Sequence, residues 1–118
     1  MKKPGQIAVV RFPRPDLEVG KLRPVLLIAK LPGDFDDWLV CMISTQLRHE
    51  ITGFDETVRS SDPDFAGCGL KVTSLVRIAR LAAVEGKALI GALGEISAER
   101  VARIRSHLGA WLTAQIAP

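Results

Sequence analysis

The pattern of apolar and polar positions predicts strands through most of the chain and one helix at its end. Apolar runs with the length and spacing of strands cover residues 6–12, 24–30, 38–43, 72–78 and 80–84. A short strand is expected near Ile51, in an otherwise polar stretch. The stretches 13–22 and 59–69 contain proline and glycine, which favour surface loops. This order predicts a mainly β (α+β) fold, a small and partly open SH3-like barrel that carries a C-terminal helix.

The helix is expected over residues 97–115. Ser97 is a good N-cap, and Glu99 places a negative charge in the first turn. One apolar stripe follows at helical spacing, formed by Val101, Ile104, Leu108, Trp111 and Leu112. We therefore expect the stripe to face the barrel, with Trp111 as a core anchor. Arg100, Arg103 and Arg105 lie mainly off the stripe. They form either a solvated face, which we expect, or a nucleic-acid contact.

Two neighbouring strands carry the polar residues of greatest interest. Arg23 precedes Pro24, which suits the first residue of a strand because it lacks a backbone donor. The next strand ends in Ser44-Thr45-Gln46. If the strands pair antiparallel about the turn Pro32-Gly33-Asp34, Arg23 and Ser44-Thr45-Gln46 meet at one sheet edge. A guanidinium beside hydroxyls and an amide can hold a phosphodiester. The alternative is a solvated arginine beside an ordinary strand end.

Composition narrows the class of protein only slightly. The 118 residues are expected to form one domain, residues 1–118, with a single core. A net charge of +3 favours an anionic partner weakly. We find no apolar run long enough to span a bilayer and no signal-peptide core, so a cytoplasmic location without membrane attachment is expected. Cys41 and Cys68 have no metal-ligand spacing, and we predict neither a metal nor a cofactor.

Five sequence blocks together resemble the PemK/MazF family. They are Pro4-Gly5-Gln6-Ile7-Ala8-Val9-Val10-Arg11-Phe12-Pro13, Lys21-Leu22-Arg23-Pro24-Val25-Leu26, Ile43-Ser44-Thr45-Gln46, Gly69-Leu70-Lys71-Val72-Thr73-Ser74 and Ile90-Gly91-Ala92-Leu93. Their order and spacing are similar to those of the family over nearly the whole chain. The resemblance implies a toxin of a type II toxin–antitoxin pair. Most such toxins are RNA endonucleases that cleave single-stranded RNA without a metal.

The resemblance also implies roles for particular residues. Arg23 matches the family's functional arginine, and Ser44 stands where a catalytic threonine is usual, followed here by Thr45. Arg77 matches a second arginine of the plasmid-encoded branch. Ala79 occupies the position of that branch's aspartate and cannot carry a proton. We therefore predict Arg23, Ser44, Thr45 and Arg77 as catalytic residues.

A second set of residues is expected to contact the substrate or to carry protons. Glu18, His49 or Arg23 itself would have to move protons in place of residue 79, and a histidine titrates in the right range. A loop histidine flanked by charges can equally be a solvated residue. The predicted substrate-binding residues are Gln46, Thr73, Ser74, Glu18 and His49.

Two functions remain open on the sequence. The first is a sequence-selective endoribonuclease, or mRNA interferase, that a cognate antitoxin neutralises. The second is a catalytically inactive barrel of the same fold that binds DNA or a protein such as gyrase. The resemblance further implies a homodimer with RNA in a groove across both subunits. We expect the first strand to offer a surface for self-association, because Ile7, Val9 and Arg11 are predicted on an exposed face.

Overall fold

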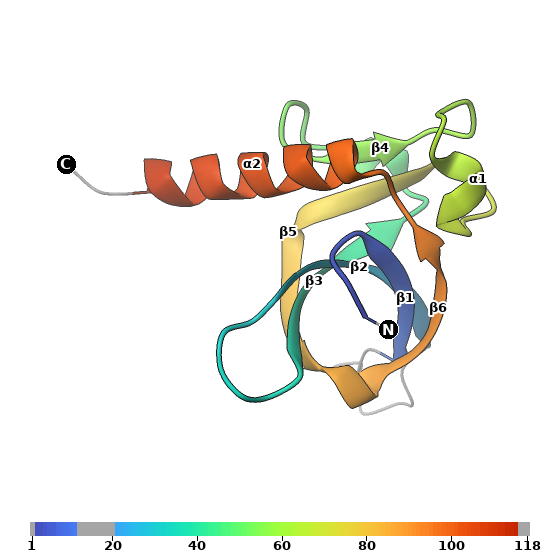
Figure 1. Cartoon of the computed structure of the whole chain (residues 1–118). Coiled ribbons are helices and arrows are strands. Elements are labelled where there is room, and N and C mark those ends of the chain that lie inside the picture. Colours follow the sequence, from blue (N-terminus) through green and yellow to red (C-terminus); the bar gives the residue numbers. More distant parts are fainter. Residues whose placement is uncertain (1, 12–20, 116–118) are drawn as a thin grey trace.

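The computed structural model describes residues 2–11 and 21–115 and has a mainly β fold (Figure 1). Six strands form one antiparallel sheet of order β4-β5-β3-β2-β1-β6. The strands are β1 (Gln6–Arg11), β2 (Leu22–Lys30), β3 (Asp37–Ser44), β4 (Glu56–Val58), β5 (Ser74–Glu85) and β6 (Leu89–Glu95). The helical elements are η1 (Leu47–His49), α1 (Phe65–Cys68), η2 (Gly86–Ala88) and α2 (Ala98–Ala114). The predicted β fold with a C-terminal helix is confirmed, and the sheet stays open between β4 and β6.

Each face of the sheet buries its own apolar cluster. On one face, core residues from β1 to β5 meet Cys68 of α1 and the α2 residues Ile104 and Leu108. The other face gathers Ala8, Val10, Val25, Leu27, Trp38 and Val40 against residues of β5, η2 and β6. Because β5 and β6 lie on opposite sides of the strand order and both contribute to this second cluster, the sheet must curl around it (Figure 1). Strands buried on both faces explain the near-continuous apolar runs of β2 and β3.

Burial on both faces also removes the expected self-association surface on β1. Ile7 is fully buried in the cluster below α2, and Ala8 and Val10 are buried on the opposite face. Val9 is half-buried, and only Arg11 of the strand is exposed. The prediction that Ile7, Val9 and Arg11 form an exposed face is therefore wrong, because a curled sheet leaves neither face of β1 to solvent.

The structure corrects three further element boundaries. Residues 72–78 and 80–84 do not form two strands but the single long strand β5, which bends sharply at an irregularity (Figure 1). Ile51 lies in a turn, and the short strand near it is β4. The strand β6 was not predicted, because Gly91 and Gly94 weaken its strand pattern.

Helix α1 lies against β6 at backbone contact distance. Gly69 ends α1 with φ of 79°, a left-handed conformation that favours glycine. A Cβ atom at Gly69 would overlap the carbonyl group of Leu93, and one at Gly94 would overlap the backbone of Gly67 and Cys68. Both positions therefore require glycine, one of them for conformation and space together.

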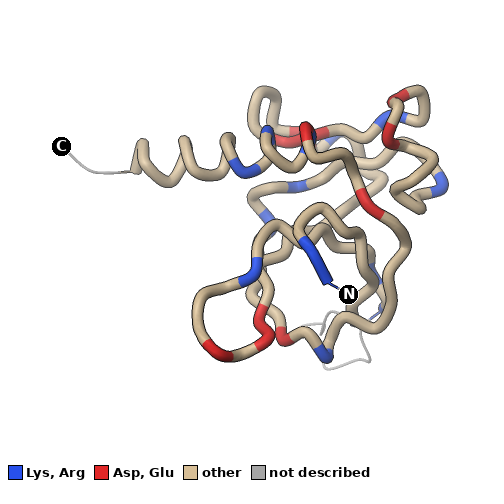
Figure 2. The backbone as a smooth tube through the Cα atoms, in the orientation of Figure 1, with Lys and Arg blue, Asp and Glu red and all other residues tan. Residues whose placement is uncertain are grey.

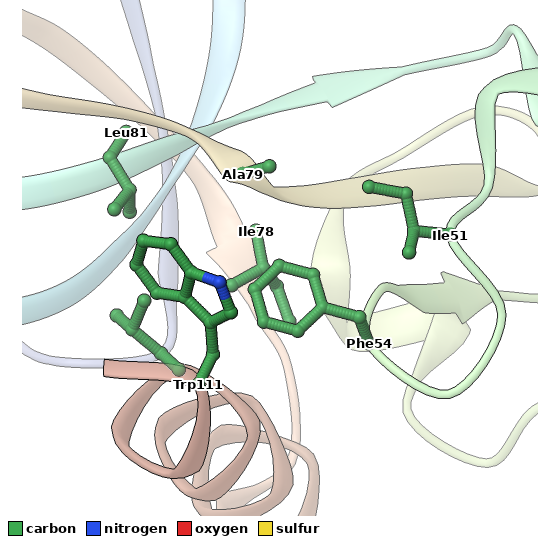
Figure 3. A pocket seen from close by; sticks show the side chains of 7 residues that line it. Ile51, Phe54, Ile78, Ala79, Leu81 and Trp111 are labelled. Atoms are coloured by element: carbon green, nitrogen blue, oxygen red, sulfur yellow. The ribbon is translucent and has the colours of Figure 1, made fainter. Parts of the chain in front are cut away.

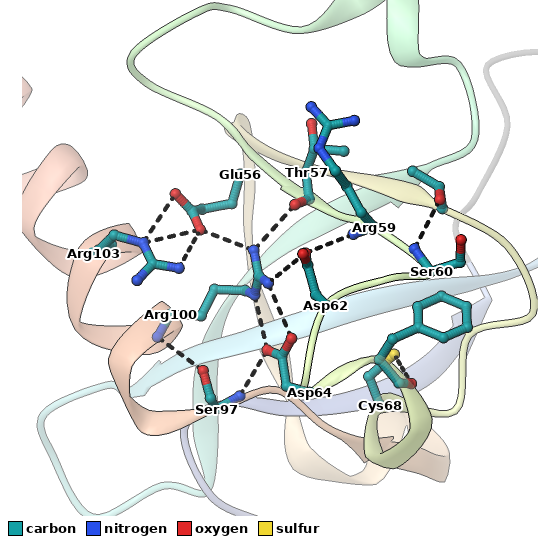
Figure 4. A network of polar contacts seen from close by, with 12 residues as sticks. Glu56, Thr57, Arg59, Ser60, Asp62, Asp64, Cys68, Ser97, Arg100 and Arg103 are labelled. Carbon is teal, nitrogen blue, oxygen red and sulfur yellow. Dashed lines mark hydrogen bonds and ion pairs between the residues drawn. The ribbon is translucent and has the colours of Figure 1, made fainter.

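Arg100 ties α2 to the segment that contains β4 and α1 (Figure 4). Arg100 is 6% exposed, and its guanidinium makes five hydrogen bonds. Nε and Nη2 donate to Asp64 at 2.9 and 3.0 Å, Nη2 also donates to Asp62 at 2.9 Å, and Nη1 donates to Glu56 at 3.1 Å. The fifth bond, from Nη1, ends on the carbonyl oxygen of Thr57 at 3.1 Å. All five guanidinium N–H groups are thereby used.

The expectation that Arg100 belongs to a solvated face is therefore wrong. The buried residues of α2 are Arg100, Ile104 and Leu108, which are spaced four apart and share one face of the helix. Arg103 does remain half-exposed, although its Nη2 also pairs with Glu56 at 3.1 Å. Figure 2 shows the acidic positions of the β4–α1 segment gathered around the first turns of α2.

The network lowers the pKa of Asp64 and of Asp62. Hydrogen bonds from Arg100 and from the Ser97 N–H hold the pKa of Asp64 well below its usual range, against the opposing effect of burial. The pKa of Asp62 is lowered by the hydrogen bond from the Arg59 N–H and by Arg100. A lowered carboxyl pKa stabilises the fold above the unfolded-state value, about 3.9, and this contribution is lost as pH falls through the folded-state value.

We expect Arg100→Met to lower the free energy of unfolding by about 3–5 kcal/mol at neutral pH, because it removes the buried cation shared by three carboxylates, of which only Glu56 keeps a second arginine partner. The difference from wild type should shrink in acid, where the carboxylates take up protons. Urea unfolding followed by tryptophan fluorescence measures both effects. The exposed Arg105 offers a control, since Arg105→Met should change stability by less than about 0.5 kcal/mol. Equal losses in the two variants would contradict the role of Arg100.

Candidate functional site

Strand pairing brings Arg23 and Ser44 to the same part of the sheet. Arg23 is exposed on β2, opposite Val10 of β1. The pairing of β2 with β3 begins at Val25 and Met42. Continued two residues beyond these last paired positions, the same register would set Arg23 opposite Ser44. Opposite residues of antiparallel strands have Cβ atoms about 5 Å apart and point to the same face. The meeting of these two residues stays a prediction, and a register continued past the last paired residues would agree with it.

Arg77 joins the same face from the other side of β3. It is half-buried on β5 and pairs with Met42, while Leu75 pairs with Ser44. Arg77 is thus a diagonal neighbour of Ser44, a separation of about 7–8 Å that a long side chain spans. The strands β2 and β5 therefore carry one arginine each, on either side of Ser44 in β3.

The end of β3 forms a tight turn at the site. The Ser44 hydroxyl accepts a hydrogen bond from the Gln46 N–H at 3.0 Å and keeps its own proton for donation. Thr45 and Gln46 are exposed, and the Gln46 side-chain oxygen accepts a hydrogen bond from Arg48 Nη1. The exposed His49 follows on η1, where its N–H donates to the Gln46 carbonyl at 3.1 Å. Residues 44–49 are thus one compact polar segment beside Arg23.

Two other predicted site residues, Thr73 and Ser74, are placed differently. The Thr73 hydroxyl accepts the Ser60 N–H at 2.9 Å and so holds the loop before α1. Ser74 is 2% exposed, and its hydroxyl donates to the Val72 carbonyl at 2.8 Å. It pairs with the core residue Val58, so it points to the face opposite Ser44. Glu18 lies outside the described residues.

An apolar pocket of about 390 Å³ lies at the bend of β5, between this strand and α2 (Figure 3). Its walls are Ile51, Phe54, Ile78, Ala79, Leu81, Leu108 and Trp111. No lining residue carries a titratable group, so the pocket can hold apolar groups but cannot transfer protons. Ala79, which stands at the position of a family aspartate, belongs to this pocket.

Trp111 lines this pocket and is not the core anchor that the helical stripe predicts. It is 46% exposed, and its ring lies edge-on to Phe54 with centroids 6.4 Å apart. Leu112 is 55% exposed. The stripe is buried only through Leu108, because the last turns of α2 extend past the sheet (Figure 1). The pocket was not predicted, since the bend that brings Ala79 and Leu81 to Trp111 leaves no periodic signal.

The described residues contain neither a cluster suited to a metal ion nor a helix suited to a membrane. No group of three or more His, Cys, Asp or Glu side chains in residues 2–11 and 21–115 is arranged to hold a metal ion. Within the same ranges, no helix has the length and apolar character needed to cross a membrane.

Comparison with known families agrees with this arrangement. The model of the PemK-like, MazF-like toxins of type II toxin–antitoxin systems matches residues 3–112. The chain belongs to this family. A search of curated protein sequences found no match.

Solved structures of MazF toxins share the fold of this MazF-like chain. A MazF from Deinococcus radiodurans is 20% identical with a TM-score of 0.68, over 95% of this chain and 96% of that one. An endoribonuclease in complex with its cognate antitoxin, from a mycobacterial species, is 15% identical with a TM-score of 0.67 over the full length of both chains. Mycobacterium tuberculosis toxin MazF-mt6 is 19% identical with a TM-score of 0.61, over 92% of this chain and 96% of that one.

Proposed function

We propose that this MazF-like chain is an endoribonuclease that cleaves single-stranded RNA with Arg23 at its centre. The observation that supports the proposal is the strand register, in which Arg77 is a diagonal neighbour of Ser44 and the continued β2–β3 register would set Arg23 opposite Ser44. The structurally similar mycobacterial protein is named an endoribonuclease, which adds support.

The chemistry assigned to these residues is attack of a ribose 2′-hydroxyl on the adjacent phosphorus. The attacking oxygen forms a bond to phosphorus and loses its proton to a base, while the bond to the 5′-oxygen breaks and that oxygen gains a proton. The products are a 2′,3′-cyclic phosphate and a free 5′-hydroxyl. Two guanidinium groups stabilise the charge that builds on the non-bridging oxygens, and Arg23 grips two of them at once.

The hydroxyls and the polar segment after β3 orient the RNA. Ser44 donates the proton that its turn leaves free, and Thr45 and Gln46 offer further exposed polar groups. Ala79 carries no proton, so the reaction needs another carrier. His49 is a candidate among the described residues, because an imidazole can both accept and donate a proton, and it lies on η1 directly after this turn.

We expect Arg23→Ala to lower kcat about 10²- to 10³-fold, the usual effect of removing one preorganised charge-stabilising group. Arg23→Lys should restore little, because an ammonium cannot form the bidentate grip. Ser44→Ala should cost less than Arg23→Ala, with Arg77→Ala between them. The assay is cleavage of a long unstructured RNA with mapped ends, in excess EDTA. Arg105→Ala is a matched control, an exposed arginine on α2 that should leave cleavage unchanged.

Cleavage by wild type that equals cleavage by Arg23→Ala would contradict this assignment. Loss of cutting in EDTA would contradict the metal-independent route. If wild type cuts no RNA, the second reading applies, in which a catalytically inactive barrel binds DNA or a protein target such as gyrase. The alanine at position 79 is the feature that favours that reading.

A second part of the proposal concerns the antitoxin. We expect a cognate acidic antitoxin to lay an extended or helical segment over the Arg23 face and so compete with RNA for Arg23 and Arg77. Its affinity should fall as salt rises and should fall further in Arg23→Glu. Calorimetric titration at low and high salt measures this, with Arg105→Glu as the control of equal charge change. An equally tight complex in Arg23→Glu would place the antitoxin elsewhere.

The third part is a homodimer, which the family resemblance implies. Since β1 is buried, the exposed apolar side chains of Leu81, Trp111 and Leu112 are the surface we assign to it. We expect sedimentation equilibrium at micromolar concentration to give the mass of a dimer and Trp111→Glu to shift it toward the monomer. A monomeric wild type would contradict the dimer, whereas a dimeric Trp111→Glu would contradict only this choice of surface.

A further inference from the structure

Asp55 is a nearly buried carboxylate that accepts hydrogen bonds from two backbone N–H groups. It lies directly before β4 and is 8% exposed. Its Oδ2 accepts the Ile51 N–H at 2.8 Å, and its Oδ1 accepts the Ile78 N–H at 3.0 Å. A carboxylate offers each donor its own oxygen, which the amide of an asparagine cannot do.

The Ile78 N–H is a donor that the sheet itself leaves without a partner strand. On β3, the neighbouring residues Cys41 and Met42 pair with Leu81 and Arg77. Residues 78–80 of β5 therefore have no opposite residue on β3 and form a bulge. On the other side, the pairing of β4 ends at Val76. Because Ile78 is fully buried, its N–H needs an acceptor, and Asp55 supplies it.

The same bond fixes the backbone directly beside Arg77. Arg77 is the last residue of β5 that pairs with β3 before the bulge, and it lies one residue beyond the end of β4 pairing. The hydrogen bond from the Ile78 N–H to Asp55 therefore holds the β5 backbone just beyond the last residues that pair with β3 and with β4. A loose strand end here would let the Arg77 guanidinium drift from Ser44, and misplacement by about 1 Å is enough to slow a reaction severely.

We propose that Asp55 is a positioning residue for RNA cleavage, because its carboxylate caps the β5 bulge and thereby holds Arg77 on the face shared with Arg23 and Ser44. This inference rests on the proposed endoribonuclease function. Asp55 itself touches no substrate and acts through Arg77.

The test is a double-mutant cycle in the RNA cleavage assay. Asp55→Asn keeps the shape of the side chain but turns an NH₂ group toward one of the two backbone donors. We expect it to lower kcat about 10- to 100-fold, as a misplaced group does. In the Arg77→Ala background it should cause no further loss, because the residue that it positions is gone. The control is Asp34→Asn, the same change at an exposed carboxylate between β2 and β3, which should keep the wild-type kcat.

A wild-type kcat in Asp55→Asn would overturn the proposal, and so would an equal loss with and without Arg77. Amide hydrogen exchange tests the same bond without any activity. The Ile78 amide should exchange slowly in wild type and at least about tenfold faster in Asp55→Asn, with the Val76 amide unchanged. If wild type cuts no RNA, the endoribonuclease proposal fails, and exchange still decides whether Asp55 caps the bulge.

Should Asp55→Asn not fold, the wild-type chain alone gives the answer. A scalar coupling across the hydrogen bond, from the Ile78 amide nitrogen to the Asp55 carboxylate carbon, is expected together with slow exchange. An Ile78 amide that exchanges as fast as those of exposed loops would overturn the proposal.

Discussion

The buried guanidinium of Arg100 fixes how the helix lies on the sheet. Its partners come from β4 and from the irregular segment that leads to α1, two parts of the chain with little regular structure of their own. Apolar contacts through Ile104 and Leu108 hold the same helix face, but they are non-directional. Five charge-assisted hydrogen bonds add direction, because each fails if the helix rotates or slides.

Strand β4 connects the Arg100 network to the candidate site that contains Arg77. Glu56, which holds Arg100, is the neighbour of Asp55, which bonds to the β5 bulge. The bulge in turn adjoins Arg77. An edge strand of three residues thus lies between the helix and the arginine, and its position is set from both sides. Short strands with few ladder bonds need such side-chain support to keep their register.

The sequence predicted those parts of the fold that local chemistry determines. The turn at Pro32-Gly33-Asp34 and two apolar runs were enough to pair β2 with β3, and their register, continued past Val25 and Met42, would bring Arg23 beside Ser44. Helix α2 followed from its N-cap, since the Ser97 hydroxyl does accept the Arg100 N–H at 3.2 Å. The spacing of four between Arg100, Ile104 and Leu108 could also have predicted a buried arginine.

What could not be predicted depends on distant segments meeting. The bulge of β5 is visible only against β3, so one strand was taken for two. The Asp62, Asp64 and Glu56 partners of Arg100 are about forty residues away in the chain. The exposure of Trp111 depends on where the sheet ends below α2 and not on helix periodicity. Ser74 illustrates the limit at the site, because its orientation is set by pairing with β4.

The contact between α1 and β6 has a consequence for genetics. Gly69 and Gly94 meet backbone on both sides, so no side chain can be added at either position without moving a strand. Selection for cells that survive expression of a growth-inhibiting toxin enriches variants that have lost it. Any missense change at these two codons adds a Cβ atom. Survivors should therefore carry substitutions at two glycines remote from any reacting group, and such a cluster would report folding, not chemistry.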